Sequence, residues 1–426
     1  SGDWLTPRLN GIKYFEKPPL QYWATAAAYD AFGVHHWTAR LWPALTGFLG
    51  VLLMFFAGAR LYGAATGFYA ALVLGSSFLY AAIAHVITLD MGLTFFLTLA
   101  MAGALLALDA RADAKTHWRW IHIAWGACAL AVLSKGLVGV VLPAAVIVLY
   151  MLIKRDFALW RRLHFFTGGL VFMAICAPWF MLVSLANPEF AWFFFVHEHL
   201  QRYTTTIHQR YQPWWYFVPI LLAGMLPWTL TLVDALNAAR KRLTSGKDFD
   251  PMLFLLLWAG VIFAFFSLSG SKLPSYILPI FPALALLVAL RLTTINGRTF
   301  AWQLAPIALL AAAGIAAVPY TVNLASASIP ADMYQAQMPW LYAAAITLLG
   351  GLVAAIVCSR RGKVRCAVVV CAFSGLITTQ LVVTSEDSLS PSHSTYHLAL
   401  KLQPYLKPGV PFYSVGGYEQ TLPFYI

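Results

Sequence analysis

The chain contains repeated apolar stretches of about 20 residues, the length that a helix needs to cross the hydrocarbon core of a bilayer. Only 10% of its 426 residues are charged, and its mean hydropathy is +0.72. Soluble domains carry roughly 25% charged residues. Because a soluble chain this apolar could not cover its own surface, the sequence predicts an all-α polytopic membrane protein.

Twelve stretches qualify as candidate spans, at about 38–60, 64–84, 88–109, 118–134, 137–153, 164–186, 214–236, 251–268, 273–291, 301–321, 340–358 and 366–384. The stretch at 273–291 contains Pro274, Pro279 and Pro282. Such breaks are tolerated where neighbouring helices or a cavity satisfy the freed backbone groups.

These spans predict three parts: a first external loop with interfacial helices at 1–37, a transmembrane domain at 38–384, and a further region at 385–426. The last region reads as a linker, a helix at Thr395–Leu406, a strand at Val410–Val415 and a second helix start. We expect it to be the start of an external α/β domain. Because the chain opens on polar residues and stops without a tail, we expect it to be a segment of a longer protein.

The distribution of basic residues predicts how the spans are oriented. Alternate connections hold 18 of the 28 lysines and arginines, namely Arg60, Arg111, Lys115, Arg119, Lys154, Arg155, Arg161, Arg162, Arg240, Lys241, Arg242, Lys247, Arg291, Arg298, Arg360, Arg361, Lys363 and Arg365. By the positive-inside rule these connections are cytoplasmic. With their six aspartates they account for the whole net charge of +12, so the charge orients the protein and gives no support to nucleic-acid binding.

The five cysteines lie inside or at the edge of apolar spans and show no metal-binding spacing. We interpret them as small packing residues. The predicted external connections 1–37, 187–213 and 322–339 are longer and rich in Tyr, Trp, His and mixed charges. Loops with such diverse chemistry commonly carry function, which places the predicted site outside.

The first external loop is the most informative segment. Asn10-Gly11 is a turn signal, and Pro18-Pro19 precedes a predicted helix at 20–32 that would lie along the membrane surface. Glu16 and Lys17 would then sit at the bilayer edge at a helix start, which favours anions. The alternative is an ordinary interfacial anchor in which the lysine reaches toward the headgroups.

Asp90 stands at the head of the apolar span 88–109. A carboxylate there is costly unless it is paired, functional or a helix cap. Lys17, Lys135, Arg202 and Lys272 lie in four different external connections. If these connections converge, the four cations form a phosphate pocket. The alternative is four unrelated rim charges.

A divalent metal, zinc or magnesium, is a further hypothesis. Glu16 and His197 could bind it together, with Glu198 and His199 beside them. The His-Glu-His spacing is weak evidence, because metal-binding histidine pairs on helices are usually four residues apart.

These motifs together resemble the polyprenyl-phosphate-sugar-dependent membrane glycosyltransferases, and within them the bacterial aminoarabinose transferases that modify lipid A. The first loop carries the most specific match, in Asp3-Trp4-Leu5-Thr6-Pro7-Arg8-Leu9-Asn10-Gly11 and Tyr14-Phe15-Glu16-Lys17-Pro18-Pro19. Supporting matches are Leu89-Asp90, Ser134-Lys135-Gly136, His197 to Tyr203, and Ser271 to Pro274 with Tyr276.

The resemblance implies a GT-C-type fold with thirteen spans, of which about twelve lie here, and a periplasmic C-terminal α/β domain. In the family an acidic motif follows the first span. We expect that motif to lie upstream of this chain, and Asp3 should not be given its role.

The implied reaction is an inverting transfer of aminoarabinose from undecaprenyl phosphate to a lipid A phosphate, at the periplasmic face of the bacterial inner membrane. By this resemblance the catalytic residues are Asp90, Glu16 and Lys17, and the donor phosphate contacts are Lys17, Lys135, Arg202, Tyr14, Lys272 and Tyr276. Glu16 and His197 would hold the metal. We expect no organic cofactor and a monomer among membrane lipids.

Two other functions remain open. One is a related transferase with another sugar, or with a protein or glycolipid acceptor. The other is a transporter of lipid-linked sugars, which should show repeated halves and broken charged helices near the midplane. No such repeat is visible, and the charges cluster at the external edge, which favours an enzyme.

Overall fold

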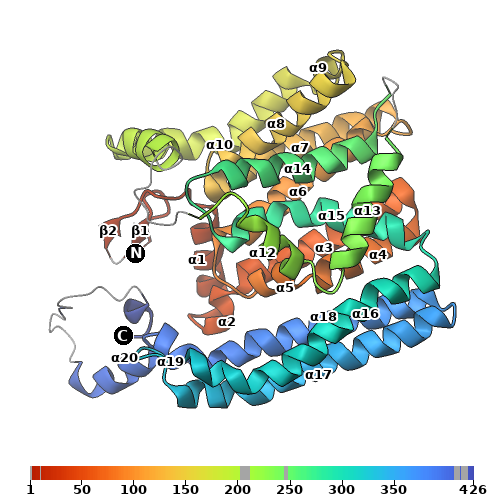
Figure 1. Cartoon of the computed structure of the whole chain (residues 1–426). Helices are drawn as coiled ribbons and strands as arrows, with labels where there is room; N and C mark the ends of the chain where they lie inside the picture. The colour runs from red at the N-terminus through yellow and green to blue at the C-terminus, as the bar shows by residue number, and fades with distance from the viewer. Residues whose placement is uncertain (1, 10, 202–211, 244–247, 407–412, 414–420) are drawn as a thin grey trace.

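The chain folds into a bundle of apolar helices with small polar elements at one end (Figure 1). The computed structural model describes residues 2–9, 11–201, 212–243, 248–406, 413 and 421–426. The sheet formed by these residues is a two-stranded antiparallel hairpin of β1 (Arg8–Leu9) and β2 (Ile12–Lys13). The predicted all-α membrane fold is therefore confirmed.

The helices follow in chain order. They are α1 (Leu20–Phe32), α2 (His36–Ala39), α3 (Leu41–Tyr62), α4 (Ala64–Ser76), α5 (Phe78–Ile83), α6 (Leu89–Leu108), α7 (Ala114–Lys135), α8 (Val138–Lys154), α9 (Leu159–Arg162), α10 (Phe165–Ala186), the π-helix η1 (Trp192–Gln201), α12 (Phe217–Gly224), α13 (Thr229–Lys241), α14 (Pro251–Leu268), the 3-10 helix η2 (Pro274–Ile280), α15 (Phe281–Leu292), α16 (Gly297–Ala317), η3 (Val318–Leu324), α17 (Ala331–Arg360), α18 (Val364–Ser385), η4 (Glu386–Leu389), α19 (Ser390–His393), α20 (Tyr396–Leu402), η5 (Gln403–Tyr405) and η6 (Leu422–Phe424).

Local sequence sets many of these boundaries. Asp113 caps α7 by accepting a hydrogen bond from Thr116 N at 2.7 Å, and Asp250 caps α14, which Pro251 opens. Asn296 does the same for α16, accepting from Thr299 N at 2.8 Å. A side-chain oxygen at this position satisfies backbone N–H groups that the helix leaves unpaired. The helix predicted at 20–32 is α1, which begins directly after Pro18-Pro19.

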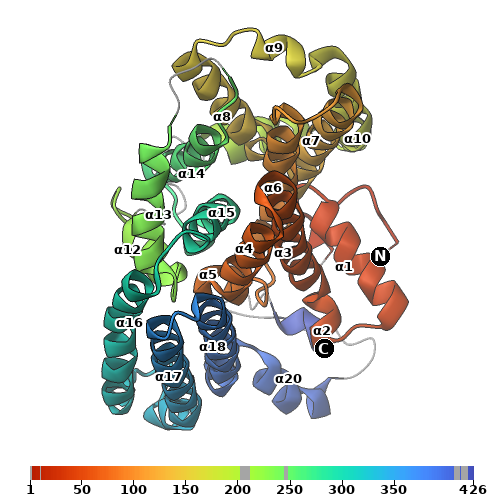
Figure 2. The ribbon, with the colours of Figure 1, turned by 90° about the vertical axis from the view of Figure 1, so that its right-hand side faces the viewer.

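Two elements form the centre of the bundle. In the apolar windows of α6 and of η2–α15, 89% and 83% of the residues are buried, against 17% in α10 and 17% in α17. Viewed along the bundle, α15 lies among α4, α6, α13 and α14, whereas α16, α17 and α18 form a separate row (Figure 2). The start of α6 and the η2 turn therefore belong to the two most buried apolar segments among the described candidate spans.

All twelve predicted spans coincide with helices, but not all are full crossings by length and composition. Among the described residues, eight helical segments are long and apolar enough to cross a membrane, or nine if α12 and α13, bent by 106°, count as one. The segment predicted at 64–84 breaks into α4 and α5, and α8 has 17 residues. α7 is long enough but begins with charged and polar residues and ends with Lys135. The chain is a multi-pass membrane protein with three weaker candidate spans.

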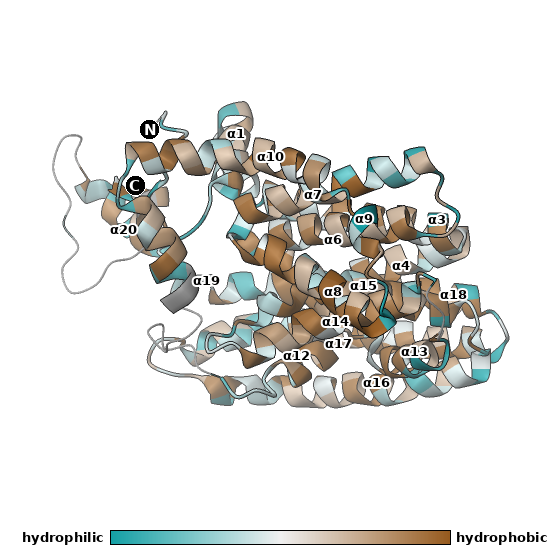
Figure 3. Ribbon diagram, turned by 90° about the horizontal axis from the view of Figure 1, so that it is seen from above, coloured by the Kyte–Doolittle hydropathy of each residue, from teal (hydrophilic) through white to brown (hydrophobic). Residues whose placement is uncertain are grey.

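The connections separate by composition onto the two ends of the bundle. The first loop, residues 2–37, lies at one end with α19 and α20, and we call this the loop end (Figure 1). The described turns rich in Lys and Arg lie at the other end, which we call the basic end. Hydrophilic residues gather at both ends and the helices between them are mostly apolar (Figure 3). The predicted grouping of basic connections is therefore confirmed.

The region from 385 onward is only partly described. The predicted helix at Thr395–Leu406 is present as α20 and η5. Most of the predicted strand at 410–415, and the helix start after it, lie outside the described residues.

The prediction that all five cysteines are packing residues is only partly correct. Cys128, Cys176 and Cys371 are buried, whereas Cys358 is half-buried and Cys366 is exposed. Hydropathy could not distinguish the two sets, because both occur in or beside apolar stretches.

Candidate active site

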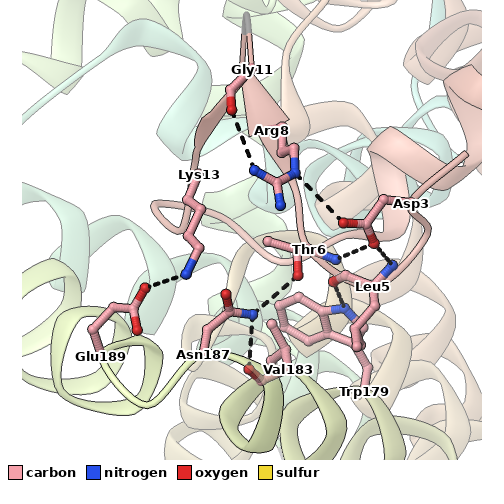
Figure 4. Close-up of polar contacts among 10 residues, drawn as sticks. All are labelled: Asp3, Leu5, Thr6, Arg8, Gly11, Lys13, Trp179, Val183, Asn187 and Glu189. Atoms are coloured by element: carbon pink, nitrogen blue, oxygen red, sulfur yellow. Dashed lines mark hydrogen bonds and ion pairs between the residues drawn. The ribbon is translucent and has the colours of Figure 1, made fainter. Parts of the chain in front are cut away.

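The first loop is fixed against the end of α10 by polar contacts (Figure 4). Trp179 Nε1 donates to Leu5 O at 3.1 Å, and Asn187 Nδ2 donates to Thr6 Oγ1 at 3.1 Å. Asn187 is buried, and its amide also donates to a carbonyl in the last turn of α10. Because a buried polar group that loses its partner is costly, these bonds set the position of the loop on the helix.

Asp3 and Lys13 secure the same loop at its surface. Asp3 Oδ1 accepts from Leu5 N and Thr6 N, each at 3.0 Å, and these two backbone hydrogen bonds hold the pKa of the Asp3 carboxyl below its usual value. Lys13 Nζ lies 2.7 Å from Glu189 Oε1, and both side chains are largely exposed. Asp3 therefore stabilises a turn of the first loop. That it does not take the role of the family's acidic motif remains a prediction.

An aromatic cluster below the loop positions the next two residues. Phe15 is buried against Phe190, with ring centroids 5.3 Å apart, and the Trp179 ring also contacts Phe190, with centroids 5.4 Å apart. Glu16 and Lys17 follow Phe15 directly, so burial of this ring places both beside η1.

Lys17 lies between the first loop and η1. Its Nζ lies 3.3 Å from Glu198 Oε2 and donates to the Glu16 carbonyl at 2.7 Å. Glu198 has a side chain only 2% exposed. The Glu16 carboxylate accepts from Tyr14 OH at 3.0 Å. The sequence placed Glu198 only among possible metal ligands, whereas here it is the carboxylate facing Lys17.

A second charged cluster lies at the start of α6. Asp90 is buried there, with one carboxylate oxygen paired with the Lys135 ammonium and the other accepting from Ser275 Oγ at 2.8 Å. The Lys135 ammonium also lies 4.2 Å from the centre of the Tyr276 ring, which is cation–π distance. Three predicted site residues are thus brought together from α6, α7 and η2.

The helix cap considered for Asp90 is not observed. Thr88 occupies the N-cap position of α6, and Asp90 uses both oxygens for Lys135 and Ser275. At the other side of the pair, Gly136 ends α7 with φ of +91°. That conformation favours glycine, and the sharp turn leaves Lys135 as the last residue of its helix. Sequence reasoning missed Ser275, although it lies inside a segment that was already singled out.

Lys272 is held by backbone carbonyls. Its Nζ donates to Gln212 O at 2.9 Å and to Ser269 O at 2.5 Å. Burial lowers the pKa of the Lys272 ammonium. In this arrangement Lys272 ties the segment before η2 to the segment before α12. Its predicted contact with a donor phosphate remains a prediction.

The predicted metal site is only partly described. His197 Nδ1 lies 3.5 Å from Glu198 Oε1, and its ring stacks on Phe193 with centroids 4.9 Å apart. Within the described ranges, no three His, Cys, Asp or Glu side chains are placed to share one metal ion. Arg202 and the predicted residues that follow it lie outside those ranges. Because the described donors do not make a full ligand set, we derive no chemical step through a metal.

A cavity of about 700 Å³ connects the first loop, α1 and the start of α6. Its wall includes the aromatic rings of Trp4, Tyr14, Tyr22 and Trp23, the acids Asp3 and Asp30, and the segment Ile87–Leu89 that precedes Asp90. Tyr14, which donates to Glu16, and Leu89, the neighbour of Asp90 in the chain, both border this space. The cavity is therefore lined by aromatic and polar side chains next to both charged clusters in the sequence.

The chain is similar in sequence to known membrane glycosyltransferases. Residues 16–182 match the family model described as dolichyl-phosphate-mannose-protein mannosyltransferase. An undecaprenyl phosphate-alpha-4-amino-4-deoxy-L-arabinose arabinosyl transferase of Pseudomonas fluorescens is 34% identical over 304 residues, which are 70% of this chain and 51% of that protein. One from Pseudomonas aeruginosa is 35% identical over 291 residues, 67% of this chain and 51% of that protein.

The similarity to solved structures extends over the whole chain. The crystal structure of ArnT from Cupriavidus metallidurans bound to undecaprenyl phosphate superposes with a TM-score of 0.94 at 38% identity, covering 100% of this chain and 77% of that one. The apo structure gives a TM-score of 0.92. The chain spans about half the length of the curated relatives that it matches.

Proposed function

The chain belongs to the family of polyprenyl-phosphate-sugar-dependent membrane glycosyltransferases that includes ArnT, and on this basis we propose that it transfers 4-amino-4-deoxy-L-arabinose from undecaprenyl phosphate to a phosphate of lipid A. The observation that carries the proposal is the match to ArnT over the whole chain, at 38% identity and a TM-score of 0.94. The paired charges at the loop end give it a chemical basis.

Lys17 is proposed to stabilise the leaving group. In the reaction, the bond between the anomeric carbon and the donor phosphate oxygen breaks, and its electron pair leaves with undecaprenyl phosphate. An ammonium already positioned where this charge develops lowers the barrier. The contact of Lys17 with Glu198 at 3.3 Å holds the ammonium in place, and a bound phosphate would compete with that carboxylate for it. Lys135, Arg202, Tyr14, Lys272 and Tyr276 are proposed as further donor contacts.

The acceptor needs little activation. A lipid A phosphate is ionised near neutral pH, so its oxygen can attack the anomeric carbon without a general base, and attack from the face opposite the leaving group inverts the configuration. Asp90 and Glu16 are therefore proposed to orient groups or to bind the amino-sugar cation. The pairing of Asp90 with Lys135 and of Glu16 with Tyr14 suits an orienting role.

We propose that the protein lies in the bacterial inner membrane with the loop end facing the periplasm. The positive-inside rule supports this orientation, because the described turns rich in Lys and Arg lie at the basic end. A divalent metal held by Glu16 and His197 and a monomeric state are also proposed. Metal analysis of the purified protein and light scattering in detergent test these two points.

A related acceptor is the second candidate. The family model that matches residues 16–182 describes transferases that act on proteins. A serine or threonine hydroxyl would need a carboxylate base, and Glu16 and Asp90 are the residues proposed for that role. A lipid-linked-sugar transporter is less well supported, because its sequence signature of repeated halves is missing.

Reconstitution tests the proposal directly. The protein would be incubated with undecaprenyl-phosphoryl aminoarabinose and lipid A in detergent or liposomes, and the products analysed by mass spectrometry. We expect lipid A carrying one aminoarabinose on a phosphate. Transfer to a peptide hydroxyl or to another glycolipid, with none to lipid A, would instead identify the second candidate. Movement of the donor across liposomes without transfer would indicate a transporter.

A further inference from the structure

The turn between α17 and α18 brings two cysteines together at the basic end, far from the candidate active site. Cys358 Sγ and Cys366 Sγ lie 3.5 Å apart, about the van der Waals contact distance of two sulfur atoms. The two residues are eight positions apart on different helices, so no Cys-x-x-Cys motif marked them. Both are free thiols, and Cys366 is exposed whereas Cys358 is half-buried.

The backbone of the turn fixes this pair. Lys363 N donates to Cys358 O at 2.9 Å, and Gly362 N donates to Ser359 O at 3.0 Å. Gly362 has φ of +76°, which lets the chain reverse within three residues. Ser359 Oγ also donates to Gly297 O at 2.8 Å, tying the end of α17 to the start of α16. Hydrogen bonds within the turn and to α16 therefore hold the two sulfur atoms in contact.

Burial separates these cysteines from the other three. A cysteine that serves only for packing is usually fully buried, as Cys128, Cys176 and Cys371 are. An exposed thiol in contact with a second thiol is instead the arrangement of a reactive sulfur beside a resolving one.

The surface around the two cysteines is positively charged. Arg360, Arg361, Lys363 and Arg365 are exposed around Cys366, and the sequence from 354 to 385 contains no carboxylate. A locally positive surface raises the encounter rate of anionic molecules. We propose that Cys358 and Cys366 form a reversible dithiol–disulfide site that reacts with anionic low-molecular-weight disulfides.

The reaction is a thiol–disulfide exchange in two steps. The exposed Cys366 sulfur attacks one sulfur of the small disulfide, giving a mixed disulfide and releasing one small thiol. The Cys358 sulfur then attacks Cys366 Sγ, forming the internal disulfide and releasing the second small thiol. The two cysteine protons leave with the two released thiols, so one external disulfide is reduced as the protein dithiol is oxidised. This site rests on the sulfur contact and does not depend on the transferase activity.

Thiol counting with oxidised glutathione, which is anionic, tests the proposal. The purified protein in detergent is incubated with oxidised glutathione, denatured, labelled with a maleimide mass tag and separated on a non-reducing gel. We expect the loss of two labelled thiols in a monomer, and their return after reduction. Trypsin should release two peptides joined by a disulfide, because it cleaves at the four basic residues of the turn.

Single variants separate the two roles. Cys358→Ser should stop at a glutathione adduct on Cys366, and Cys366→Ser should not react. Cys371→Ala, on the same helix but buried, is the matched control and should behave as the unmodified protein does. If the unmodified protein keeps all its labelled thiols in excess oxidised glutathione, or gives only adducts or intermolecular dimers, the internal site is refuted.

A charge variant tests the selectivity. Arg361→Gln combined with Lys363→Gln should slow the reaction with oxidised glutathione several-fold at low salt and leave the reaction with neutral hydroxyethyl disulfide unchanged. Equal slowing with both reagents, or with neither, would overturn the selection of anionic disulfides.

Discussion

The buried pair of Asp90 and Lys135 allows a quantitative prediction. Asp90→Asn keeps the shape of the side chain and an oxygen for Ser275 but removes the negative charge. The Asp90 and Lys135 side chains are only 8% and 15% exposed. In the variant, the Lys135 ammonium would therefore be an unpaired charge with little access to water. Loss of one partner of a buried pair costs about 3–5 kcal/mol.

The surroundings of Lys135 reduce this cost. Its contact with the Tyr276 ring at 4.2 Å remains and is worth roughly 1 kcal/mol. We therefore expect Asp90→Asn to lower the free energy of unfolding by about 2–4 kcal/mol. Lys135→Met should cost a similar amount, because it leaves the carboxylate as the unpaired charge.

The double variant distinguishes pairing from separate effects. It contains no unpaired charge, so the two single costs should not add, and we expect a coupling free energy of about 2 kcal/mol. Reversible unfolding of all four proteins in mixed micelles, followed by helical circular dichroism, measures this. Single costs that add within about 0.5 kcal/mol would refute the pair as a stabilising unit. If Asp90 and Lys135 also act in transfer, the double variant should lose less stability than the two single costs combined and should remain inactive.

Three further predictions concern the first loop. Lys17→Ala should lower the rate of sugar transfer by about 100-fold or more, because its ammonium is proposed to stabilise the leaving phosphate. Lys13→Gln in the same loop, which removes only an exposed ion pair, should change the rate little. Equal losses for the two variants in a transfer assay would argue against this role of Lys17. Trp179→Phe removes the indole bond to Leu5 O and should weaken loop docking by about 1 kcal/mol, seen as faster hydrogen exchange in residues 2–9 with unchanged exchange in α6. Backbone hydrogen bonds lower the pKa of the Asp3 carboxyl in the folded protein. Its contribution to the stability of the fold is therefore fully present above the ordinary pKa of 3.8 and is lost as the pH falls through the lower pKa of the folded state. An NMR titration of Asp3 with a midpoint at or above 3.8 would contradict this.

Hydropathy, charge and local motifs determined the architecture of this protein. In a bilayer every backbone group must be paired within the protein, so a chain of long apolar stretches has little choice but helices. For that reason the twelve predicted ranges all coincide with helices, and the basic turns gather at one end. Helix starts such as Pro18-Pro19 before α1 were predictable because capping and proline effects act within a few residues.

Only the tertiary structure decided which side chains meet. Lys135 pairs with a carboxylate 45 positions away, Ser275 donates to the same carboxylate across 185 positions, and Lys17 faces Glu198 across 181. These contacts depend on how helices pack and at which height each turn lies, and no local pattern encodes either. For the same reason the sequence does not reveal that Cys358 and Cys366 meet at the turn between α17 and α18. The sequence determined which end of the bundle carries each charged group, and packing determined its partner.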